Sequence, residues 1–183
     1  MTTTRREQIL DTAATLFAER GFHGVSVHDI GSACGISGPA LYKHFAGKDD
    51  VLTQSLTSIS QRLLDEGRSR SRAAGSPDAA LGALIAWHIE FALSHPALIV
   101  IQEREWANLR VEGRREVRAL QLAYIDIWVD VLRRLRDDLD AAEARAAVQA
   151  TFGLLNSTPH SARISATAMQ SRLWTMARSA LLA

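Results

Sequence analysis

Residues 26–52 constrain the fold more than any other part of the chain. Ser26 can cap a helix by accepting a hydrogen bond from a first-turn amide, and Asp29 stands where an acidic side chain completes a capping box. Gly35 can end that helix, because glycine adopts a positive φ without a Cβ penalty. The pattern therefore predicts a helix over residues 27–34.

A second short helix is predicted directly after this turn. Ser37 can cap it, and Pro39 fits in its first turn, where the backbone amides have no helical partner to lose. Ile30, Leu41 and Phe45 supply the apolar contacts that two crossed helices need. The simplest interpretation is a helix-turn-helix, a motif whose second helix enters the major groove of DNA.

The second helix is flanked by side chains that can donate hydrogen bonds to phosphate oxygens. Lys43 and Lys48 are the only two lysines in a chain with nineteen arginines, and compact ammonium groups suit a phosphate backbone. The alternative for either lysine, taken alone, is an ordinary solvated surface residue. The candidate DNA-contacting residues are Ser26, Ser37, Gly38, Pro39, Ala40, Tyr42, Lys43, His44 and Lys48.

This stretch resembles the DNA-binding segment of the TetR family of transcriptional regulators. The family pattern ends in Leu-Tyr-x-His-Phe-x-x-Lys-x-x-Leu, and residues 41–52 read LYKHFAGKDDVL, with the leucine at the fourth place after the lysine. Gly31 stands where the family commonly has alanine, which should loosen the first helix by about 1 kcal/mol. Gly38 and Ala40 are short, so hydrogen-bonded base readout from them is poor, although Ala40 could touch a thymine methyl group.

Composition excludes several other classes of protein. The net charge is only +1 over 183 residues, so DNA binding must come from locally placed cations and helix N-termini rather than from bulk charge. The single cysteine, Cys34, excludes a disulfide framework and a multi-cysteine metal site, and we expect it to be a small core residue. No metal or cofactor is predicted. Without a signal peptide or a long apolar run, the chain is expected to be a soluble cytoplasmic protein.

Helical periodicity continues along the chain, which predicts an all-α fold of about nine helices. A helix over residues 5–20 precedes the helix-turn-helix, and another begins at Lys48. Residues 67–77, GRSRSRAAGSP, are the best linker candidate. The later helices are expected at residues 78–94, 97–109, 116–139, 141–156 and from 165 on. The resemblance implies a DNA-binding domain at residues 1–47 and an effector-binding and dimerisation domain at residues 48–183.

The last helix is expected to turn Met169, Leu173, Met176 and Ala180 inward. The two C-terminal helices are rich in alanine and carry few charges on their apolar stripes, which suits helix packing across a two-fold axis. The alternative is that they only complete the core of one subunit. The resemblance implies a homodimer through these helices, and a dimer would read two half-sites of a pseudo-palindromic operator in double-stranded DNA.

Aromatic residues gather in the middle helices and indicate either a solid core or a pocket for an apolar ligand. Stripes of this kind are usually core, but the middle helices of the resembled family generally enclose a small-molecule site. His88 lies on an apolar face, where a hydrogen-bonded core histidine is as reasonable as a pocket residue. The candidate ligand-binding residues are Trp87, His88, Phe91, Arg104, Trp106, Tyr124, Trp128, Phe152 and Asn156.

These patterns together predict a ligand-responsive transcriptional regulator, a repressor that a small apolar effector releases from its operator. Residues 102–128 are loosely similar to regulators of lipid and acyl-CoA metabolism, so a fatty acyl group or an acyl-CoA is the candidate effector. One alternative is a helical-bundle enzyme, but the chain has no HExxH, phosphate loop or nucleophile elbow. The other alternative is a DNA-binding protein without an effector.

Overall fold

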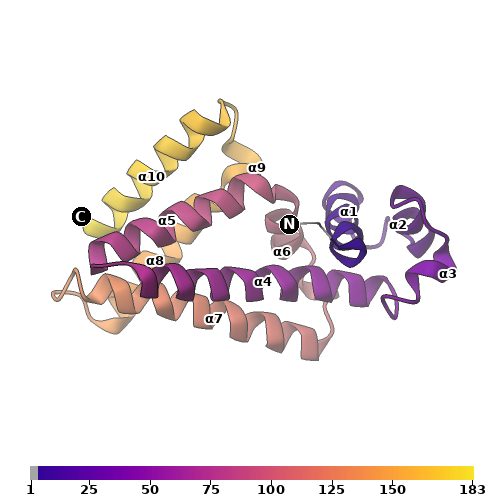
Figure 1. Ribbon diagram of the computed structural model, residues 1–183, viewed down its shortest axis with the longest axis horizontal. Coiled ribbons are helices and arrows are strands. Elements are labelled where there is room, and N and C mark those ends of the chain that lie inside the picture. The colour runs from indigo at the N-terminus through magenta and orange to yellow at the C-terminus, as the bar shows by residue number, and fades with distance from the viewer. Residues whose placement is uncertain (1–3) are drawn as a thin grey trace. The chain divides into compact units, whose positions relative to one another are not determined.

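The computed structural model describes residues 4–183, except for the side-chain environment of Gly38. Within this range the chain is helical and contains no strand, which confirms the predicted all-α class (Figure 1). Each of the nine predicted helices corresponds to an observed one, and α9 is an additional single turn. The helices are α1 (Arg5–Arg20), α2 (Val27–Ala33), α3 (Gly38–Leu41), α4 (Lys48–Ala73), α5 (Pro77–Ser94), α6 (Pro96–Arg104), η1 (Trp106–Asn108), α7 (Val111–Arg133), α8 (Ala141–Leu155), α9 (Thr158–Ser161) and α10 (Ala166–Leu182).

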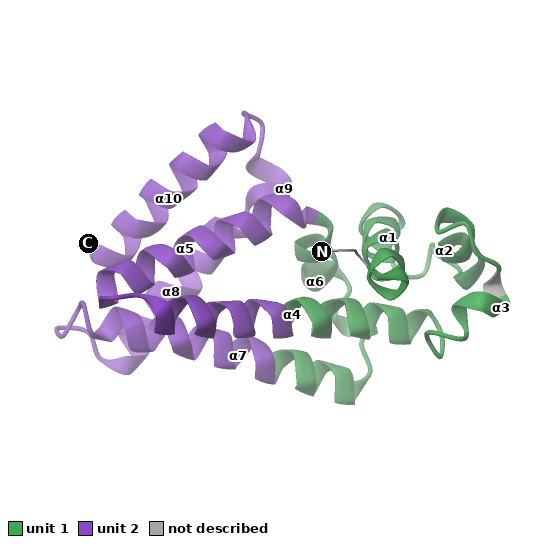
Figure 2. Cartoon of the chain, in the orientation of Figure 1, with its two compact units in different colours: residues 1–60, 97–118 green, residues 61–96, 119–183 purple. Residues whose placement is uncertain are grey.

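The chain forms two compact units (Figure 2). Unit 1 consists of residues 1–60 and 97–118, and unit 2 consists of residues 61–96 and 119–183. Helices α4 and α7 each contribute their N-terminal part to unit 1 and the remainder to unit 2. These units differ from the expected DNA-binding domain at residues 1–47 and effector-binding domain at residues 48–183, which stay a prediction.

Local sequence signals determine the first two helices of unit 1. Thr4 and Glu7 form a capping box at the start of α1, and Ser26 and Asp29 form the predicted one at the start of α2. Each box satisfies two backbone amides that a helix N-terminus would leave unpaired. Gly35 has φ +66°, as expected for the residue that turns the chain after α2. The buried face of α1 consists of Ile9, Leu10, Ala13, Ala14, Leu16 and Phe17.

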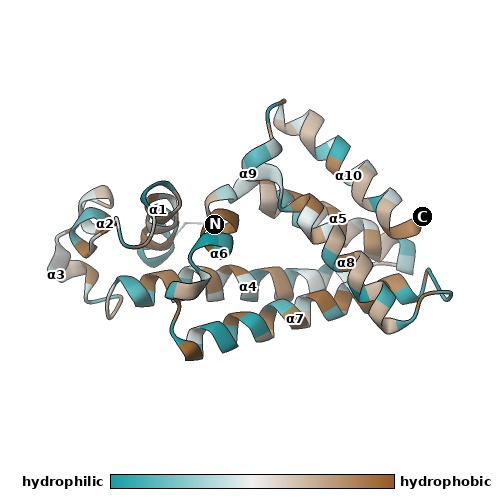
Figure 3. Cartoon of the chain, turned by 180° about the vertical axis from the view of Figure 1, so that it is seen from behind, coloured by the Kyte–Doolittle hydropathy of each residue, from teal (hydrophilic) through white to brown (hydrophobic). Residues whose placement is uncertain are grey.

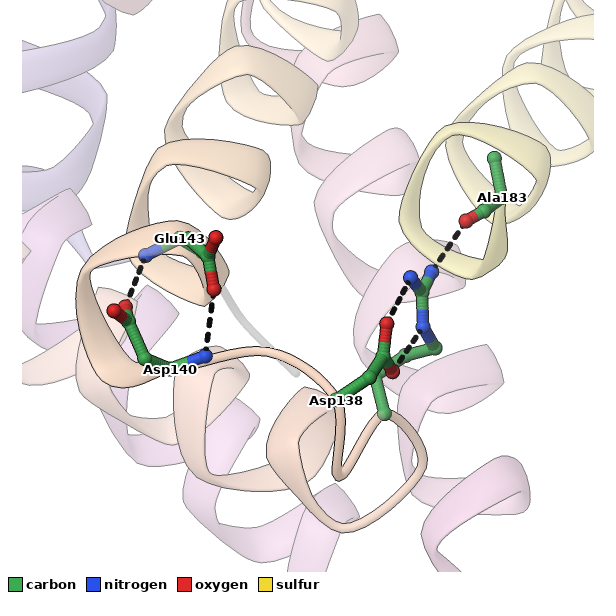
Figure 4. A network of polar contacts seen from close by, with 5 residues as sticks. Asp138, Asp140, Glu143 and Ala183 are labelled. Atoms are coloured by element: carbon green, nitrogen blue, oxygen red, sulfur yellow. Dashed lines mark hydrogen bonds and ion pairs between the residues drawn. The ribbon is translucent and has the colours of Figure 1, made fainter.

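Unit 2 is built from the C-terminal parts of α4 and α7 together with α5, α8, α9 and α10. Its core includes the side chains of Leu84, Trp128, Val148 and Leu173, one from each of four helices. Helix α7 is amphipathic, as the alternating teal and brown bands along its ribbon show (Figure 3). Arg136 joins the α7–α8 connection to the end of α10, since it binds Asp138 and donates a 2.6 Å hydrogen bond to the Ala183 carbonyl (Figure 4).

The prediction of a linker at residues 67–77 is wrong for most of its length, because α4 continues to Ala73. Arginine and alanine favour helix, and they outweigh the serines of this run. Gly67 lies inside α4, where a Cβ atom would stand 2.6 Å from Cε2 of Tyr124. This glycine therefore permits close packing of a ring on the helix and does not break it.

Two further expectations about buried residues are corrected. In α10 the buried positions are Met169, Leu173, Ala177 and Leu181, which follow each other at intervals of four. Met176 is instead 45% exposed, and Ala180 is exposed as well. Outside this helix, Cys34 is a half-buried free thiol rather than a core residue. Among the described residues, no single helix is long and apolar enough to cross a membrane.

Candidate DNA-binding surface and aromatic core

The segment around α3 separates an apolar side from a polar side. Leu41 and Phe45 are buried together with Ile30 of α2. Regular helix ends at Leu41, but hydrogen-bonded turns continue to Phe45, whose amide donates to the carbonyl of Leu41. The buried side chains hold residues 37–45 against α2, so the polar side chains between them are left on the outer surface.

Most of the predicted DNA-contacting residues lie on this outer surface. Tyr42 is 58% exposed, which is unusual for so large a ring, and Lys43 and His44 beside it are also exposed. A phenol, an ammonium and an imidazole on one short segment can all donate to phosphate oxygens. Ser26, Ser37 and Pro39 are exposed, Ala40 and Lys48 are half-buried, and the surroundings of Gly38 lie outside the described residues.

Two of the predicted contacts also have structural partners within unit 1. The Ser26 hydroxyl accepts a hydrogen bond from the amide of Asp29 in the α2 cap. The Lys48 ammonium donates 2.9 Å hydrogen bonds to the carbonyls of Phe22 and Val25, and it lies 4.4 Å from the centroid of the Phe22 ring. Lys48 therefore ties the start of α4 to the connection before α2.

Arginines of α1 add contacts that the sequence analysis did not identify. Arg5 donates a 2.7 Å hydrogen bond to the carbonyl of Cys34, at the C-terminal end of α2 where positive charge is favoured. Arg6 lies over the Phe45 ring and donates to Gln54. No local pattern marks these residues, since their partners are distant along the chain.

Residues 97–118 also contact the first helices of unit 1. Arg104 donates to the carbonyl of Ala18 at 3.2 Å, and Arg110 lies 3.4 Å from a carboxylate oxygen of Asp49. Glu105 is buried and accepts a 2.7 Å hydrogen bond from the Asn108 amide. These bonds join the end of α6 and the start of α7 to α1 and α4.

Unit 1 also contains an open groove of about 1240 Å³. It is lined by the connection before α2 and the first turn of α2, by Pro39, Tyr42 and Ala46, and by the starts of α4 and α7. Its walls include the carboxylates of Asp29, Asp49, Glu112 and Glu116, so it does not have the apolar character predicted for the effector site. No group of three or more histidine, cysteine, aspartate or glutamate side chains within residues 4–183 could hold a metal ion.

The core of unit 2 contains an aromatic cluster centred on His88, which is only 2% exposed. The ring of Phe152 stacks on the imidazole with 4.5 Å between centroids, and the ring of Tyr124 lies parallel to it at 5.9 Å. Phe91 and Trp128 approach the same imidazole edge-on, at 5.6 and 6.0 Å. Helices α5, α7 and α8 therefore place four aromatic rings around the His88 imidazole.

Both ionisable groups of this aromatic cluster are uncharged at neutral pH. Burial lowers the pKa of His88 to about 4 and outweighs the opposite effect of its hydrogen bond to Asn156. The His88 Nε2 and Asn156 Oδ1 atoms are 3.0 Å apart, and an amide oxygen can only accept. The proton of the neutral ring is thus on Nε2, and Nδ1 has a free lone pair. Burial also raises the pKa of Tyr124.

Several buried polar atoms of this core form no hydrogen bond. They include the Nε1 atoms of Trp87 and Trp128, the Tyr124 hydroxyl, Nδ1 of His88 and Nε2 of Gln121. Trp128 lies close enough to lower the pKa of Tyr124, against the larger opposite effect of burial, but no hydrogen bond of normal geometry joins the two. Each such atom typically costs about 1–3 kcal/mol of stability, so their number in one core needs a physical explanation.

The structure brings seven of the nine predicted ligand-binding residues into the core of unit 2. Arg104 and Trp106 belong to unit 1 instead, where Arg104 is bonded to α1 and Trp106 begins η1. The sequence analysis did not single out Arg62 and Arg70, whose guanidinium carbons lie 5.6 and 4.7 Å from the centroid of the Trp87 ring. The seven residues in unit 2 are Trp87, His88, Phe91, Tyr124, Trp128, Phe152 and Asn156.

Two family models match the chain, one in each half. The model described as "Bacterial regulatory proteins, tetR family" matches residues 9–54. The model described as "Tetracyclin repressor-like, C-terminal domain" matches residues 74–160. The first match contains the surface around α3, and the second contains all five rings of the aromatic cluster.

Individual relatives agree with these matches. The transcriptional repressor KstR2 of Rhodococcus jostii is 31% identical over 143 residues, which cover 74% of this chain and 70% of the relative. The structure of a TetR-family regulator from Bordetella parapertussis has a TM-score of 0.82 at 26% identity, covering 94% of this chain and 93% of the other. FadR of Bacillus subtilis, solved in complex with stearoyl-CoA, has a TM-score of 0.74 at 18% identity, covering 94% and 97%.

Proposed function

Because this chain belongs to the TetR family of bacterial transcriptional regulators, we propose that it is a DNA-binding repressor that a small apolar effector releases from its operator. The family and the relatives are regulators and not enzymes. The observation that carries the proposal is the polar surface of residues 37–44, held outward by buried apolar side chains. The protein would act in the cytoplasm, where bacterial DNA lies.

The unit that binds DNA is proposed to be a homodimer. A segment as short as residues 37–45 contacts too few base pairs for a specific site, whereas a dimer reads two half-sites about 34–36 Å apart. The last two long helices, α8 and α10, are the proposed interface. The exposed side chains of Trp174 and Met176 on α10 support this, because large apolar groups are enriched at subunit interfaces. In this scheme residues 1–47 bind DNA and residues 48–183 bind the effector and the partner subunit.

The aromatic cluster of unit 2 is the proposed effector site. Its polar atoms without partners support this role, since an effector could supply the missing hydrogen bonds. The stearoyl-CoA complex of FadR supports a fatty acyl group or an acyl-CoA as the candidate ligand, because the two proteins share a fold. Effector binding would favour a conformation with low affinity for DNA, so that DNA-bound and effector-bound states exclude each other.

The second candidate function is DNA binding without an effector. The observation that favours it is the close packing of the aromatic rings, with centroids only 4.5 Å apart for His88 and Phe152. A solid core of this kind needs no ligand. The two candidates differ in one measurable property, which is whether any small molecule lowers the affinity of the protein for its own operator.

Selection from fragmented genomic DNA tests the proposal. The purified protein is mixed with the fragments, and the retained DNA is sequenced. We expect enrichment of an inverted repeat whose half-sites are one helical turn, or a multiple of it, apart. The variant Tyr42→Ala/Lys43→Ala is the control and should enrich no sequence. Fragments from the wild type that share no motif would contradict the proposal.

The enriched duplex then serves in the effector test. Its affinity for the protein is measured by fluorescence anisotropy with stearoyl-CoA, stearate or no addition. An effector-responsive repressor releases the duplex with at least one apolar compound at a concentration that leaves an unrelated DNA-binding protein unaffected. Unchanged affinity with every acyl compound removes the acyl candidate and favours DNA binding without an effector.

A further inference from the structure

The hydrogen-bonding atoms of the aromatic cluster restrict the kind of ligand group that it can bind. We infer that the effector presents an uncharged carbonyl group, as in a ketone, ester or thioester, to the donors of Tyr124 and Trp128, and that it takes the place of the Phe152 ring. This inference rests on the proposed effector site in unit 2, and it goes further by naming the polar group that the site recognises.

The first argument is the kind of hydrogen-bonding atom that lacks a partner. Within the aromatic cluster, the Nε1 atom of Trp128 can only donate. The Tyr124 hydroxyl can donate or accept, whereas Nδ1 of His88 in the tautomer described above can only accept. Two of these three atoms can donate and only one is limited to accepting, so the complementary ligand group is an acceptor. A carbonyl oxygen has two lone pairs and can accept from two donors at once.

The second argument is the position of Phe152. Its ring centroid lies 4.5 Å from that of His88, 5.0 Å from that of Trp128 and 5.6 Å from that of Tyr124. Phe152 thus lies beside three of the four rings in unit 2 that carry a polar atom without a hydrogen bond, Trp87 being the fourth, and it can form no conventional hydrogen bond itself. Phe152 is only half-buried, whereas the three rings around it are buried, so it is the member that can leave most easily.

The third argument is charge. His88 and Tyr124 are neutral at pH 7, and a carboxylate beside them would have no positive partner. Among the described residues, the cation that influences Tyr124 is Arg70. Its guanidinium lies over Trp87 and is paired with Glu66 at 3.2 Å and with Glu90 at 3.8 Å. A buried charge without a counter-charge is strongly unfavourable, so the site selects against free acids.

A cavity variant tests the inference directly. Phe152→Ala removes a phenyl ring beside the donors, and apolar cavities of this size bind small aromatic molecules. Acetophenone, ethylbenzene and benzoate are probes of nearly equal shape that present a carbonyl, no polar atom and a carboxylate. Calorimetry at pH 7 should give an affinity for acetophenone about fivefold higher than for ethylbenzene, and no binding of benzoate.

A second readout identifies the donors. The chain has four tryptophans, so a ¹⁵N-labelled sample gives up to four indole N–H signals. The Trp128 signal, assigned by its loss in Trp128→Phe, should shift downfield with acetophenone and much less with ethylbenzene. In the Phe152→Ala/Tyr124→Phe variant the preference for acetophenone over ethylbenzene should fall to about twofold or less. Phe152→Leu, which creates a smaller cavity, repeats the comparison if the alanine variant does not fold.

Three results would overturn the inference: ethylbenzene binding as tightly as acetophenone, measurable binding of benzoate, or no binding of any probe to a folded Phe152 variant. None of these results affects the selection of operator DNA by the wild type. Failure of the inference is therefore distinguishable from failure of the proposed function, which depends on the operator and on its release.

Discussion

The two candidate sites of this protein differ in the solvent exposure of their polar side chains. Around α3, Tyr42, Lys43 and His44 are exposed, so their hydrogen-bonding groups meet water until a partner replaces it. In the aromatic cluster, the polar atoms of Tyr124 and Trp128 are buried and form no hydrogen bond. The surface can thus be altered at little cost in stability. The cluster carries a cost that only a ligand or a conformational change can remove.

The largest expected effect is on the free energy of unfolding when one aromatic residue from each region is replaced. Trp128→Ala should lower the free energy of unfolding by about 4 kcal/mol, because Trp128 is fully buried and a large cavity remains. Tyr42→Ala should change it by less than about 0.5 kcal/mol, since its ring is mostly in water. Urea unfolding followed by circular dichroism measures both. Equal losses of stability would remove the contrast between the two regions.

The next effect is on DNA affinity. Tyr42→Ala/Lys43→Ala should weaken operator binding by about 100-fold, because each subunit of the proposed dimer loses two phosphate donors. Its unfolding curve should match that of the wild type. Fluorescence anisotropy over a range of salt concentrations measures the affinity, and the slope of log affinity against log salt should decrease by about two. Arg163→Ala is the control, because Arg163 is exposed in the α9–α10 connection.

A pH dependence should follow from His88. Its pKa is about 4 when folded and about 6.5 when unfolded, so the unfolded chain binds more protons below pH 6.5. The stability is therefore complete above pH 6.5 and is lost as the pH falls toward 4, with about 2 kcal/mol lost between pH 7 and pH 5. Urea titrations of the wild type and of His88→Gln at both pH values should differ by this amount. His23→Gln, at an exposed position, should retain the full pH dependence.

The smallest expected effect is a change in stability that is neutral or favourable, although the substitution removes a buried polar group. Tyr124→Phe removes a buried hydroxyl that forms no hydrogen bond, so stability should stay the same or rise by up to about 1 kcal/mol. Thermal unfolding in the absence of any ligand measures this. A loss of more than 1 kcal/mol would indicate that the Tyr124 hydroxyl already has a hydrogen-bond partner in the protein. The hydroxyl would then need no bond from a ligand.

Local chemistry allowed much of unit 1 to be predicted from the sequence. Capping by Ser26 and Asp29 and the positive φ of Gly35 depend on neighbours a few residues away, so they are visible in the sequence. Gly67 shows the limit of this approach. It was interpreted as part of a linker, but it lies in a continuous helix, where the absence of a Cβ atom leaves room for the ring of Tyr124, which is 57 positions away.

Long-range contacts explain what could not be predicted in the candidate sites. Helical spacing placed His88, Tyr124 and Trp128 on inward faces, but only the folded chain brings Asn156 to His88, 68 positions away. Arg104 was expected near the ligand, yet it bonds to the carbonyl of Ala18 in unit 1, 86 positions away. The pairing of distant residues depends on how helices pack, and no local pattern records it.

Competition binding at physiological salt tests the central claim most directly. A labelled duplex carrying the selected inverted repeat is bound to the protein and displaced either by the same sequence or by a scrambled duplex of equal length and composition. The proposed repressor should prefer its own site at least 1,000-fold. Equal displacement by the two competitors would contradict the assignment of the α3 surface as a sequence-specific DNA-binding site.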